Sequence, residues 1–421
     1  MNTETASPEV LTTADGTPLK ESLARAQRRL KIRALLLVLP LFIFIMGTFF
    51  VPVFDMLFRS VENHMVPEIM VKTAPLLLEW DDRSGELPGE EIFAAAQSDF
   101  AIGYKAKTIL RVARRMNYEK PGFSSVFRKT ARKAGKFEPP YKEAFIKTHK
   151  KWGDIETWRY LKRESGIYTL SYYLAALDLS YGPTGEISSK SVKEAIYLKL
   201  FWRTLKLSLL ITFLCLVLAY PIAYLLSTLS VKTSNLLMIL VLLPFWTSLL
   251  VRTTAWIALL QQEGIINDVL VGIGFISNDG RLAMIHNATG TVVAMTHILL
   301  PFMVLPLYSV MKTIPPTYMR AAKNLGATPT VAFIRVYFPN TISGMGAGSI
   351  LVFIISIGYY ITPALVGGVD GTLISNFIAY HMSTSLNWGL AASLGVILLA
   401  IVLVLYYFYD RLVGIDNMKL G

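Results

Sequence analysis

Several long stretches of this sequence carry no charged side chain, and this feature limits the fold more than any other. A run of about 20 apolar residues matches an α-helix that crosses the roughly 30 Å hydrocarbon core of a bilayer. Only 17% of the 421 residues are charged and 53% are apolar, whereas about 25% of the residues in a soluble domain are charged. The sequence therefore predicts an all-α, polytopic membrane protein.

Six transmembrane helices are expected, each bounded by charged residues or by glycine, proline and asparagine. Their ranges are 34–54, 207–229, 236–256, 291–311, 343–365 and 388–409. Five segments follow from these spans. They are an N-terminal tail at 1–33, the first transmembrane helix at 34–54, an insert at 55–206, a transmembrane domain at 207–410 with a loop at 312–339, and a C-terminal tail at 411–421.

The distribution of Lys and Arg predicts that both termini lie in the cytoplasm. Basic residues precede the first span at 25–33, and the connection from Lys312 to Arg335 carries four basic residues and no acid. Short cytoplasmic loops are enriched in Lys and Arg, but long translocated domains escape this rule. The insert is therefore placed outside the cytoplasm, although it holds 26 basic against 19 acidic residues.

The insert is expected to be mostly helical, because its apolar residues recur at helical spacing in 109–116 and 158–177. Turn residues cluster at 120–122, 139–140 and 181–183. Trp152 and Trp158 are interpreted as core residues rather than as parts of a ligand site, since large aromatic side chains are mostly buried.

Neither an enzymatic nor a metal centre is predicted. Cys215 is the single cysteine, and the five histidines are widely scattered, which excludes a disulfide framework and the usual zinc-ligand spacings. The chain has no GxxxxGKS/T, GxGxxG or GxSxG pattern, so any nucleotide chemistry belongs to a partner. The net charge of +12 is attributed to membrane sidedness, and no nucleic-acid partner is expected.

The most informative stretch is the loop at 314–339, where prolines, glycine and threonines predict two short helices. Pro316 cannot continue a helix from upstream, and Thr317 can cap a new one through its hydroxyl. Gly326 suits the left-handed residue that follows a helix end. The first short helix is therefore expected at 318–325.

The second short helix is expected to begin with Thr328 and Pro329, a cap and a first-turn proline, and to run to Pro339. Small and apolar side chains on the first helix suit close docking into a groove of another protein, and two cations flank them. These residues are Tyr318, Arg320, Ala321, Ala322, Lys323 and Leu325. The alternative is an ordinary cytoplasmic connection whose basic residues contact anionic lipid.

This spacing resembles the loop of permease subunits of binding-protein-dependent ABC importers. The family pattern is Glu-Ala-Ala, three residues, Gly, and then a stretch that ends in Ile/Val-x-x-Pro. The residues that match, and to which the resemblance gives an ATPase-coupling role, are Arg320, Ala321, Ala322, Leu325, Gly326, Ala327, Phe333 and Pro339. Arg320 departs from the pattern, because it stands where the family has an acid.

Residues 243–256, 264–267 and 358–367 narrow the resemblance to permeases of spermidine/putrescine-type importers. The insert is longer than such permeases usually have. The resemblance implies a type I ABC importer permease in a bacterial inner membrane, with no cofactor of its own. Its implied partners are ABC ATPase subunits that use ATP, a second permease in a heterodimer, an extracytoplasmic solute-binding protein and membrane lipid.

Polar and aromatic residues near the outer span ends are candidates for the solute path. They are Trp246, Arg252, Trp256, Tyr359, Tyr360 and Asp370. An arginine that reaches the interface, interfacial aromatic belts and a solvated loop acid explain the same residues without a solute, so both interpretations stay open. Two other functions are retained: a membrane-anchored ligand sensor or scaffold that uses the insert, and a secondary transporter, which the lack of acids inside the spans disfavours.

Overall fold

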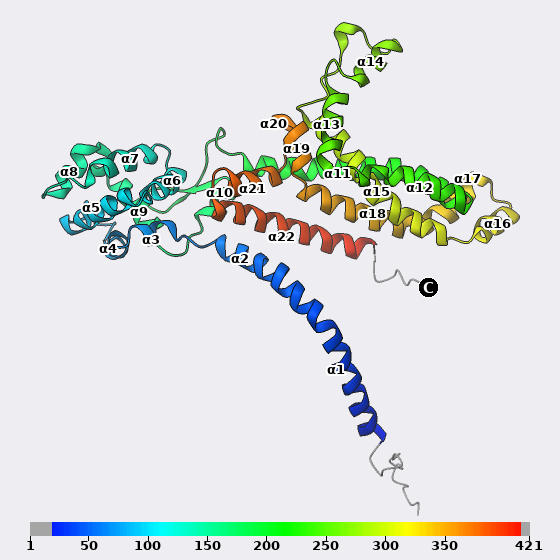
Figure 1. The fold of residues 1–421 in the computed structure, drawn as a ribbon, viewed down its shortest axis with the longest axis horizontal. Coiled ribbons are helices and arrows are strands. Elements are labelled where there is room, and N and C mark those ends of the chain that lie inside the picture. Colours follow the sequence, from blue (N-terminus) through cyan, green and yellow to red (C-terminus); the bar gives the residue numbers. More distant parts are fainter. Residues whose placement is uncertain (1–18, 414–421) are drawn as a thin grey trace, which may run out of the picture. The chain divides into compact units, whose positions relative to one another are not determined.

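The computed structural model describes residues 19–413, and nearly all of its elements are helices (Figure 1). Residues 1–18 of the predicted N-terminal tail and 414–421 of the predicted C-terminal tail lie outside the described residues. The chain divides into two units, Met1–Phe58 and Arg59–Gly421, and each is described by itself.

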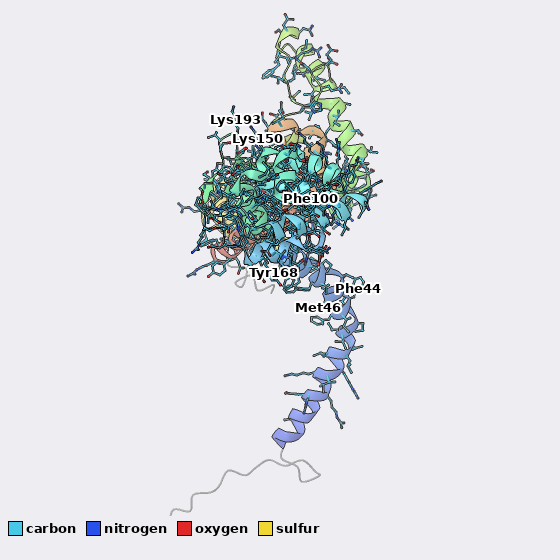
Figure 2. The ribbon with its side chains drawn as sticks, turned by 90° about the vertical axis from the view of Figure 1, so that its left-hand side faces the viewer. Phe44, Met46, Phe100, Lys150, Tyr168 and Lys193 are labelled. Atoms are coloured by element: carbon cyan, nitrogen blue, oxygen red, sulfur yellow. The ribbon has the colours of Figure 1, made fainter. Side chains whose placement is uncertain are left out.

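The described part of the first unit belongs to one long helix that contains the expected span at 34–54. It consists of α1 (Leu19–Ile45), the π-helix η1 (Met46–Phe50) and α2 (Val51–Arg59). Its apolar stretch, Gln27–Arg59, is long enough to cross a membrane. The helix begins well before the apolar run because Arg, Lys and Leu are good helix formers. The exposed side chains of Phe44 and Met46 extend from its surface (Figure 2).

The insert is a helical body with one β-hairpin. Its helices are α3 (Met65–Ile69), α4 (Thr73–Glu79), α5 (Glu90–Lys105), α6 (Ile109–Glu119), α7 (Phe123–Ala134), α8 (Tyr141–Thr148), the 3₁₀ turn η2 (Lys150–Gly153), α9 (Ile155–Glu164) and α10 (Ser171–Ala176). The antiparallel strands β1 (Leu179–Tyr181) and β2 (Ile187–Ser189) pair Leu179 with Ser189. Sequence periodicity did not indicate this hairpin.

The helix expected across 158–177 is interrupted, because long-range pairing overrides its local pattern. Residues between α9 and α10 form a β-bridge in which Glu62 pairs with Tyr168. The Asn63 N–H donates to the Ile167 carbonyl at 2.7 Å, and the Thr169 N–H donates to the Val61 carbonyl at 2.8 Å. The side chain of Tyr168 lies on the surface beside this bridge (Figure 2).

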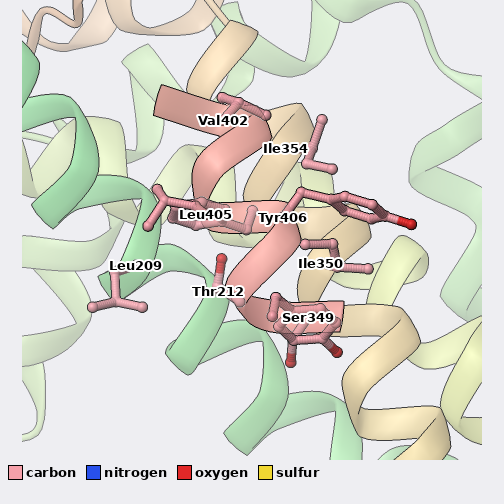
Figure 3. A pocket seen from close by; sticks show the side chains of 10 residues that line it. Leu209, Thr212, Ser349, Ile350, Ile354, Val402, Leu405 and Tyr406 are labelled. Atoms are coloured by element: carbon pink, nitrogen blue, oxygen red, sulfur yellow. The ribbon is translucent and has the colours of Figure 1, made fainter. Parts of the chain in front are cut away.

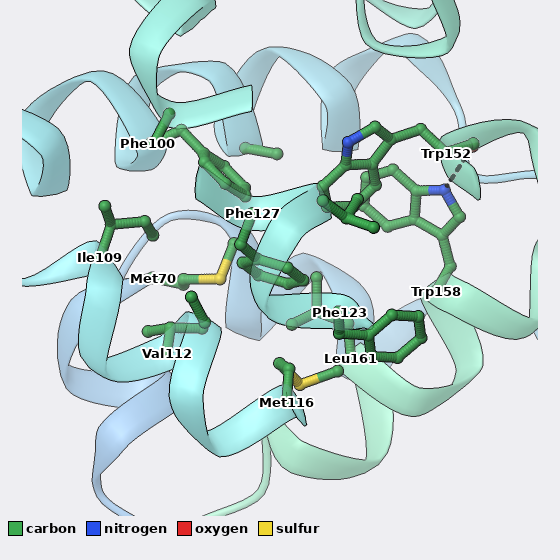
Figure 4. Close-up of a cluster of buried hydrophobic side chains, with 14 of the residues drawn as sticks. Met70, Phe100, Ile109, Val112, Met116, Phe123, Phe127, Trp152, Trp158 and Leu161 are labelled. Carbon is green, nitrogen blue, oxygen red and sulfur yellow. Dashed lines mark hydrogen bonds between the residues drawn. The ribbon is translucent and has the colours of Figure 1, made fainter. Parts of the chain in front are cut away.

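Aromatic side chains fill the core of the insert (Figure 4). Trp152 and Trp158 are both fully buried. The indole N–H of Trp158 donates to the Trp152 carbonyl at 3.0 Å, and the indole N–H of Trp152 donates to the Thr130 hydroxyl at 2.7 Å. Each buried indole N–H therefore has an acceptor, and the interpretation of both tryptophans as core residues is confirmed.

A buried ionic cluster joins α6 to α9. The Arg115 guanidinium lies 2.7 Å from the Glu164 carboxylate and 2.6 Å from that of Glu119, and it covers the Tyr172 ring. Burial raises the pKa of the Glu164 carboxyl to about 7, and Arg115 opposes that shift. Burial disfavours the Arg115 charge, but the two carboxylates outweigh it and raise the pKa of the guanidinium. Arg115 is thus the counter-charge on which this cluster depends.

The insert is fastened to the transmembrane helices by hydrogen bonds and by close packing. The Asp178 carboxylate accepts the N–H groups of Ile196, Tyr197 and Leu198, and so caps the first turn of α11. The Tyr172 ring lies directly against Gly389, where a Cβ would come within 2.3 Å of it. A glycine is therefore required where the insert packs on the start of α22.

Five helices of the described chain are long and apolar enough to cross a membrane, and one bent pair raises this number to six. Beyond the insert the elements are α11 (Tyr197–Thr228), α12 (Val231–Trp246), α13 (Leu249–Leu260), α14 (Ile265–Gly272), the 3₁₀ turn η3 (Asn278–Gly280), α15 (Ala288–Thr313), α16 (Pro316–Asn324), α17 (Pro329–Ala332), the π-helix η4 (Phe333–Tyr337), α18 (Phe338–Gly358), α19 (Ile361–Val366), α20 (Gly368–Gly371), α21 (Ile374–Ser383) and α22 (Trp388–Val413). The predicted all-α membrane fold is confirmed.

Helices α11, α15 and α18 form the core of the bundle (Figure 1). Gly348 of α18 faces Met303 of α15, and a Cβ at Gly348 would lie 2.6 Å from the Met303 sulfur. Gly344 faces Val310 in the same way, one turn away. Small residues let two membrane helices approach closely, which explains the glycines in this otherwise apolar span.

Two expected spans are broken in the structure. The span expected at 236–256 is divided between α12 and α13, and the chain bends by 94° between Val231–Trp246 and Leu249–Gly272. The span expected at 343–365 ends at Gly358, because Pro363 has no N–H to donate to the Tyr359 carbonyl. That carbonyl instead accepts the Ser375 hydroxyl at 2.7 Å. A side chain from a distant helix thus satisfies the backbone at the break.

Candidate functional site

The first helix of the loop at 314–339 begins two residues earlier than expected. Helix α16 starts at Pro316, so Thr317 lies within the helix and is not its cap. Proline suits the first helical position, because the N–H that it lacks has no partner there in any case. Gly326 has the predicted left-handed conformation, with φ of +92°. A Cβ at Gly326 would meet nothing within 4 Å, so the backbone conformation alone favours glycine there.

Helix α16 has an anchored face and an exposed face. Met319 packs against the core of the bundle, as does Ile314 just before the helix. Ala321 is exposed on the other face, and Tyr318 and Leu325 are 49% and 89% exposed. Arg320 and Lys323 are exposed beside them, while Ala322 and Ala327 are half-buried. We call the exposed residues Tyr318, Ala321 and Leu325, together with the half-buried Ala322 at their edge, the docking face.

The second half of the loop continues into the membrane, in contrast to the helix end expected at Pro339. The Thr328 hydroxyl accepts the Val331 N–H, which confirms the predicted cap. Pro339 cannot donate to the carbonyl four residues before it. The backbone hydrogen bonds shift by one residue instead, so that the Phe338 N–H donates to the Phe333 carbonyl five residues earlier. The chain thus passes through the π-turn η4 into α18 without a break.

The matched residues at the end of the loop do not belong to the docking face. Phe333 is half-buried and packs against the bundle core, and Pro339 is exposed at the start of α18. Both lie where the loop joins α18. The π-turn was not predicted, although a proline after an apolar helical stretch is a usual cause of such irregularity.

Three of the six solute-path candidates lie close to one another in the chain's contacts: Arg252 and Tyr359 lie near the two helix breaks, and Trp256 follows Arg252 by one turn of α13. Arg252 donates to the Thr247 carbonyl at the bend between α12 and α13, and it interacts electrostatically with Tyr359 at the other break. The indole N–H of Trp256 donates to His297 Nδ1 at 3.2 Å. His297 therefore carries its proton on Nε2 when neutral. Sequence reasoning missed His297, because a lone histidine in an apolar span has no spacing signal.

Helices α13 and α19 hold the breaks together. The hydroxyls of Thr253 and Thr362 lie 3.3 Å apart, and Arg252 Nε is buried without a hydrogen-bond partner among the residues that the structure describes. Irregular backbone at membrane depth is tolerated where it is enclosed by protein or faces a water-filled cavity. The breaks and the Arg252, Trp256, His297 and Tyr359 side chains therefore form the candidate solute site.

The other three candidates are not brought into this cluster. Trp246 and Tyr360 are 68% and 47% exposed. Asp370 pairs with Arg203 at 3.6 Å, and its side chain is highly exposed. An interfacial or solvated position accounts for these residues.

A separate apolar hollow of about 230 Å³ lies between α11, α18 and α22 (Figure 3). Leu209 and Thr212 come from α11, Ser349 and Ile354 from α18, and Tyr406 from α22. None of the six solute-path candidates lines this hollow. Its apolar walls fit a place at membrane depth rather than a solute site.

Comparison with known proteins covers the transmembrane part. Residues 207–414 match the family described as binding-protein-dependent transport system inner membrane component. The spermidine/putrescine transport system permease protein PotB of Haemophilus influenzae is 34% identical over 222 residues, which cover 52% of this chain and 77% of that protein. PotB of Escherichia coli is 32% identical over 224 residues, which cover 52% of this chain and 81% of that protein. The inner membrane ABC transporter permease protein YdcU of Escherichia coli is 30% identical over 226 residues, covering 51% and 72%.

A solved bacterial alginate ABC transporter, in complex with an alginate pentasaccharide-bound periplasmic protein, is a more distant structural neighbour. It is 17% identical, with a TM-score of 0.43, over 54% of this chain and 81% of that one. The family match begins at residue 207, so the insert lies outside it. On the sequence similarity of its transmembrane part, the chain belongs to the family of inner membrane components of binding-protein-dependent transport systems.

Proposed function

We propose that this chain is a permease subunit of an ABC importer whose ATP is hydrolysed by a separate subunit. The docking face on α16 carries the proposal. Met319 and Ile314 hold the helix from behind, while small and apolar side chains remain exposed in front. A short helix presented in this way suits insertion into a groove of an ATPase subunit. A sensor or scaffold would need no such surface.

We propose a polyamine such as spermidine or putrescine as the solute, on the similarity to the PotB proteins. Trp256 and Tyr359 can contact an organic ammonium group through their rings. Arg252 repels such a cation, and among the described residues it has no carboxylate within ion-pair distance. The compensating acids would come from a second permease in a heterodimer and from an extracytoplasmic solute-binding protein.

The insert and the docking face are proposed to lie on opposite sides of a bacterial inner membrane, with both termini in the cytoplasm. Asp178 of the insert contacts α11 at Tyr197, and Phe333 of the loop contacts it at Tyr224. A helix rises 1.5 Å per residue, so these points are roughly 40 Å apart, more than the hydrocarbon core. α11 alone therefore carries the chain from one side to the other.

The sidedness is tested by cysteine labelling in intact cells. In a Cys215→Ser background, a cysteine at Ser188 should react with a membrane-impermeant thiol reagent, and a cysteine at Thr330 should react only after the cells are opened. Both positions are exposed in the structure, so burial does not explain a difference. Labelling of both positions from outside would contradict the proposed topology.

The function is tested by reconstitution of the full complex in liposomes. Together with its ATPase, its companion permease and its binding protein, the chain should support spermidine or putrescine uptake that requires ATP. The matched control is the same complex with a non-hydrolysable nucleotide. ATP-driven uptake of another solute would refute the polyamine assignment alone, and failure to bind any ATPase subunit would refute the importer role.

A further inference from the structure

Four aromatic rings surround the π-turn between the docking face and α18. Phe333 and Tyr337 stack at 5.5 Å with an interplanar angle of 19°. Tyr224 of α11 meets both edge-on, with ring centroids 5.6 Å and 5.3 Å away. Tyr220, one turn earlier on α11, meets Phe333 at 6.3 Å. We call Tyr220, Tyr224, Phe333 and Tyr337 the aromatic joint.

Hydrogen bonds tie the joint to neighbouring elements. The Tyr220 and Thr341 hydroxyls lie 3.2 Å apart, linking α11 to α18. The Tyr337 hydroxyl lies 3.4 Å from that of Ser227, near the end of α11. Lys312 at the end of α15 donates to the Ser227 carbonyl at 3.3 Å. The joint therefore connects the loop to α11 and α18, and Lys312 links the same end of α11 to α15.

The π-turn brings these rings together. Pro339 has no N–H to donate, and the Phe338 N–H donates to the Phe333 carbonyl, five residues earlier instead of four. The turn places Phe333 and Tyr337 on the side that faces α11, where they stack. π-turns inside helices are rare and often occur at functional sites. Here the turn lies where the loop must pass its motion into the membrane.

We propose that the aromatic joint transmits movement of the docked loop to α11, and that Tyr224 is the positioning residue that receives it. Helix α18 follows the loop through its continuous backbone. α11 is not continuous with the loop, so it can follow only through side-chain contacts, and Tyr224 meets the rings on both sides of the π-turn. Two packed elements held in this way move as one body between discrete states. This inference rests on the proposed importer function.

The test compares three variants of the complete reconstituted complex. Tyr224→Ala should retain the ATPase subunit but move about tenfold less solute per ATP hydrolysed, the change expected when two aromatic pairs are lost. Tyr224→Phe keeps the ring and should match the wild type. Tyr407→Ala, which removes an exposed aromatic side chain from α22 outside the joint, should also match it.

A second measurement does not depend on the solute. Spin labels at Thr330 on α17 and Thr228 at the end of α11 should keep a constant separation through the ATPase cycle in the wild type, and change it in Tyr224→Ala. An unchanged separation and unchanged solute-to-ATP ratio in Tyr224→Ala would overturn the proposal. Loss of ATPase binding in Tyr224→Ala alone would also overturn it, because the ring would then support docking. If the wild type binds no ATPase, the proposed function fails and this inference falls with it.

Discussion

Replacing Ala322 by glutamate should abolish ATP-driven uptake while leaving the protein inserted in the membrane. Ala322 is half-buried at the edge of the docking face, and its neighbour Ala321 is exposed. A groove that accepts two alanines has no room for a long side chain, and an unpaired buried carboxylate costs several kcal/mol. We expect about a hundredfold weaker binding of the ATPase subunit, measured by co-purification and by stimulated ATP hydrolysis.

The matched control is Ala322→Ser, which adds one atom and no charge. It should retain ATPase binding to within about threefold, because a small hydroxyl can stay hydrated at a half-buried position. Wild-type binding by Ala322→Glu would show that the docking face is not the ATPase interface. An equal loss of ATPase binding in Ala322→Glu and Ala322→Ser would point instead to a general defect of α16.

Replacing Arg115 by methionine should destabilise the insert by about 3–5 kcal/mol, because the buried Glu164 carboxylate then loses its counter-charge. Glu164 is fully buried, and Arg115 is its partner in the ion pair that links α6 to α9. The measurement is hydrogen exchange of the α6 and α9 amides in the full-length protein. Arg111→Met is the matched control, since Arg111 lies on the same helix but is exposed.

Acidification separates the charge effect from lost packing. Burial raises the pKa of Glu164 to about 7 in the folded protein, above the ordinary value for a glutamate. A group whose pKa is higher in the folded state binds its proton on folding, so lowering the pH from 7 towards 5 favours the folded insert. The loss of insert stability caused by Arg115→Met should therefore be largest above pH 7 and smaller at pH 5. A deficit that does not depend on pH would contradict this account.

The amino-acid sequence alone was enough to predict the regular helices and the local helix caps. Uncharged runs predicted the membrane helices, and the turn residues of the loop predicted the cap at Thr328 and the left-handed Gly326. These features depend on residues within a few positions of one another, so no tertiary information is needed. The family resemblance came from the same loop, where spacing along the chain is the signal.

The breaks in the spans could not be read in this way. Residues 343–365 form one apolar run, but Pro363 stops the helix and Ser375 from a later helix satisfies the freed carbonyl. The helix expected at 158–177 is likewise interrupted by pairing with residues about a hundred positions earlier. At 158–177 a contact distant in sequence outweighs local propensity, which contributes less than about 1 kcal/mol per ordinary residue. Pro221 and Pro301 lie inside continuous helices, so a proline alone does not locate a break such as the one before Pro363.

The sequence by itself determined that the chain is an all-α membrane protein, where most spans lie, and which loop holds the residues proposed for docking, because hydropathy and capping are local properties. Only the tertiary structure decided which of these residues meet. It gathered Arg252, Trp256 and Tyr359 with the unpredicted His297, and it left Trp246, Tyr360 and Asp370 apart. It also set Tyr224 of α11 against the rings of the loop. Such side-chain contacts depend on how helices distant in sequence pack together, and no local sequence pattern encodes that packing.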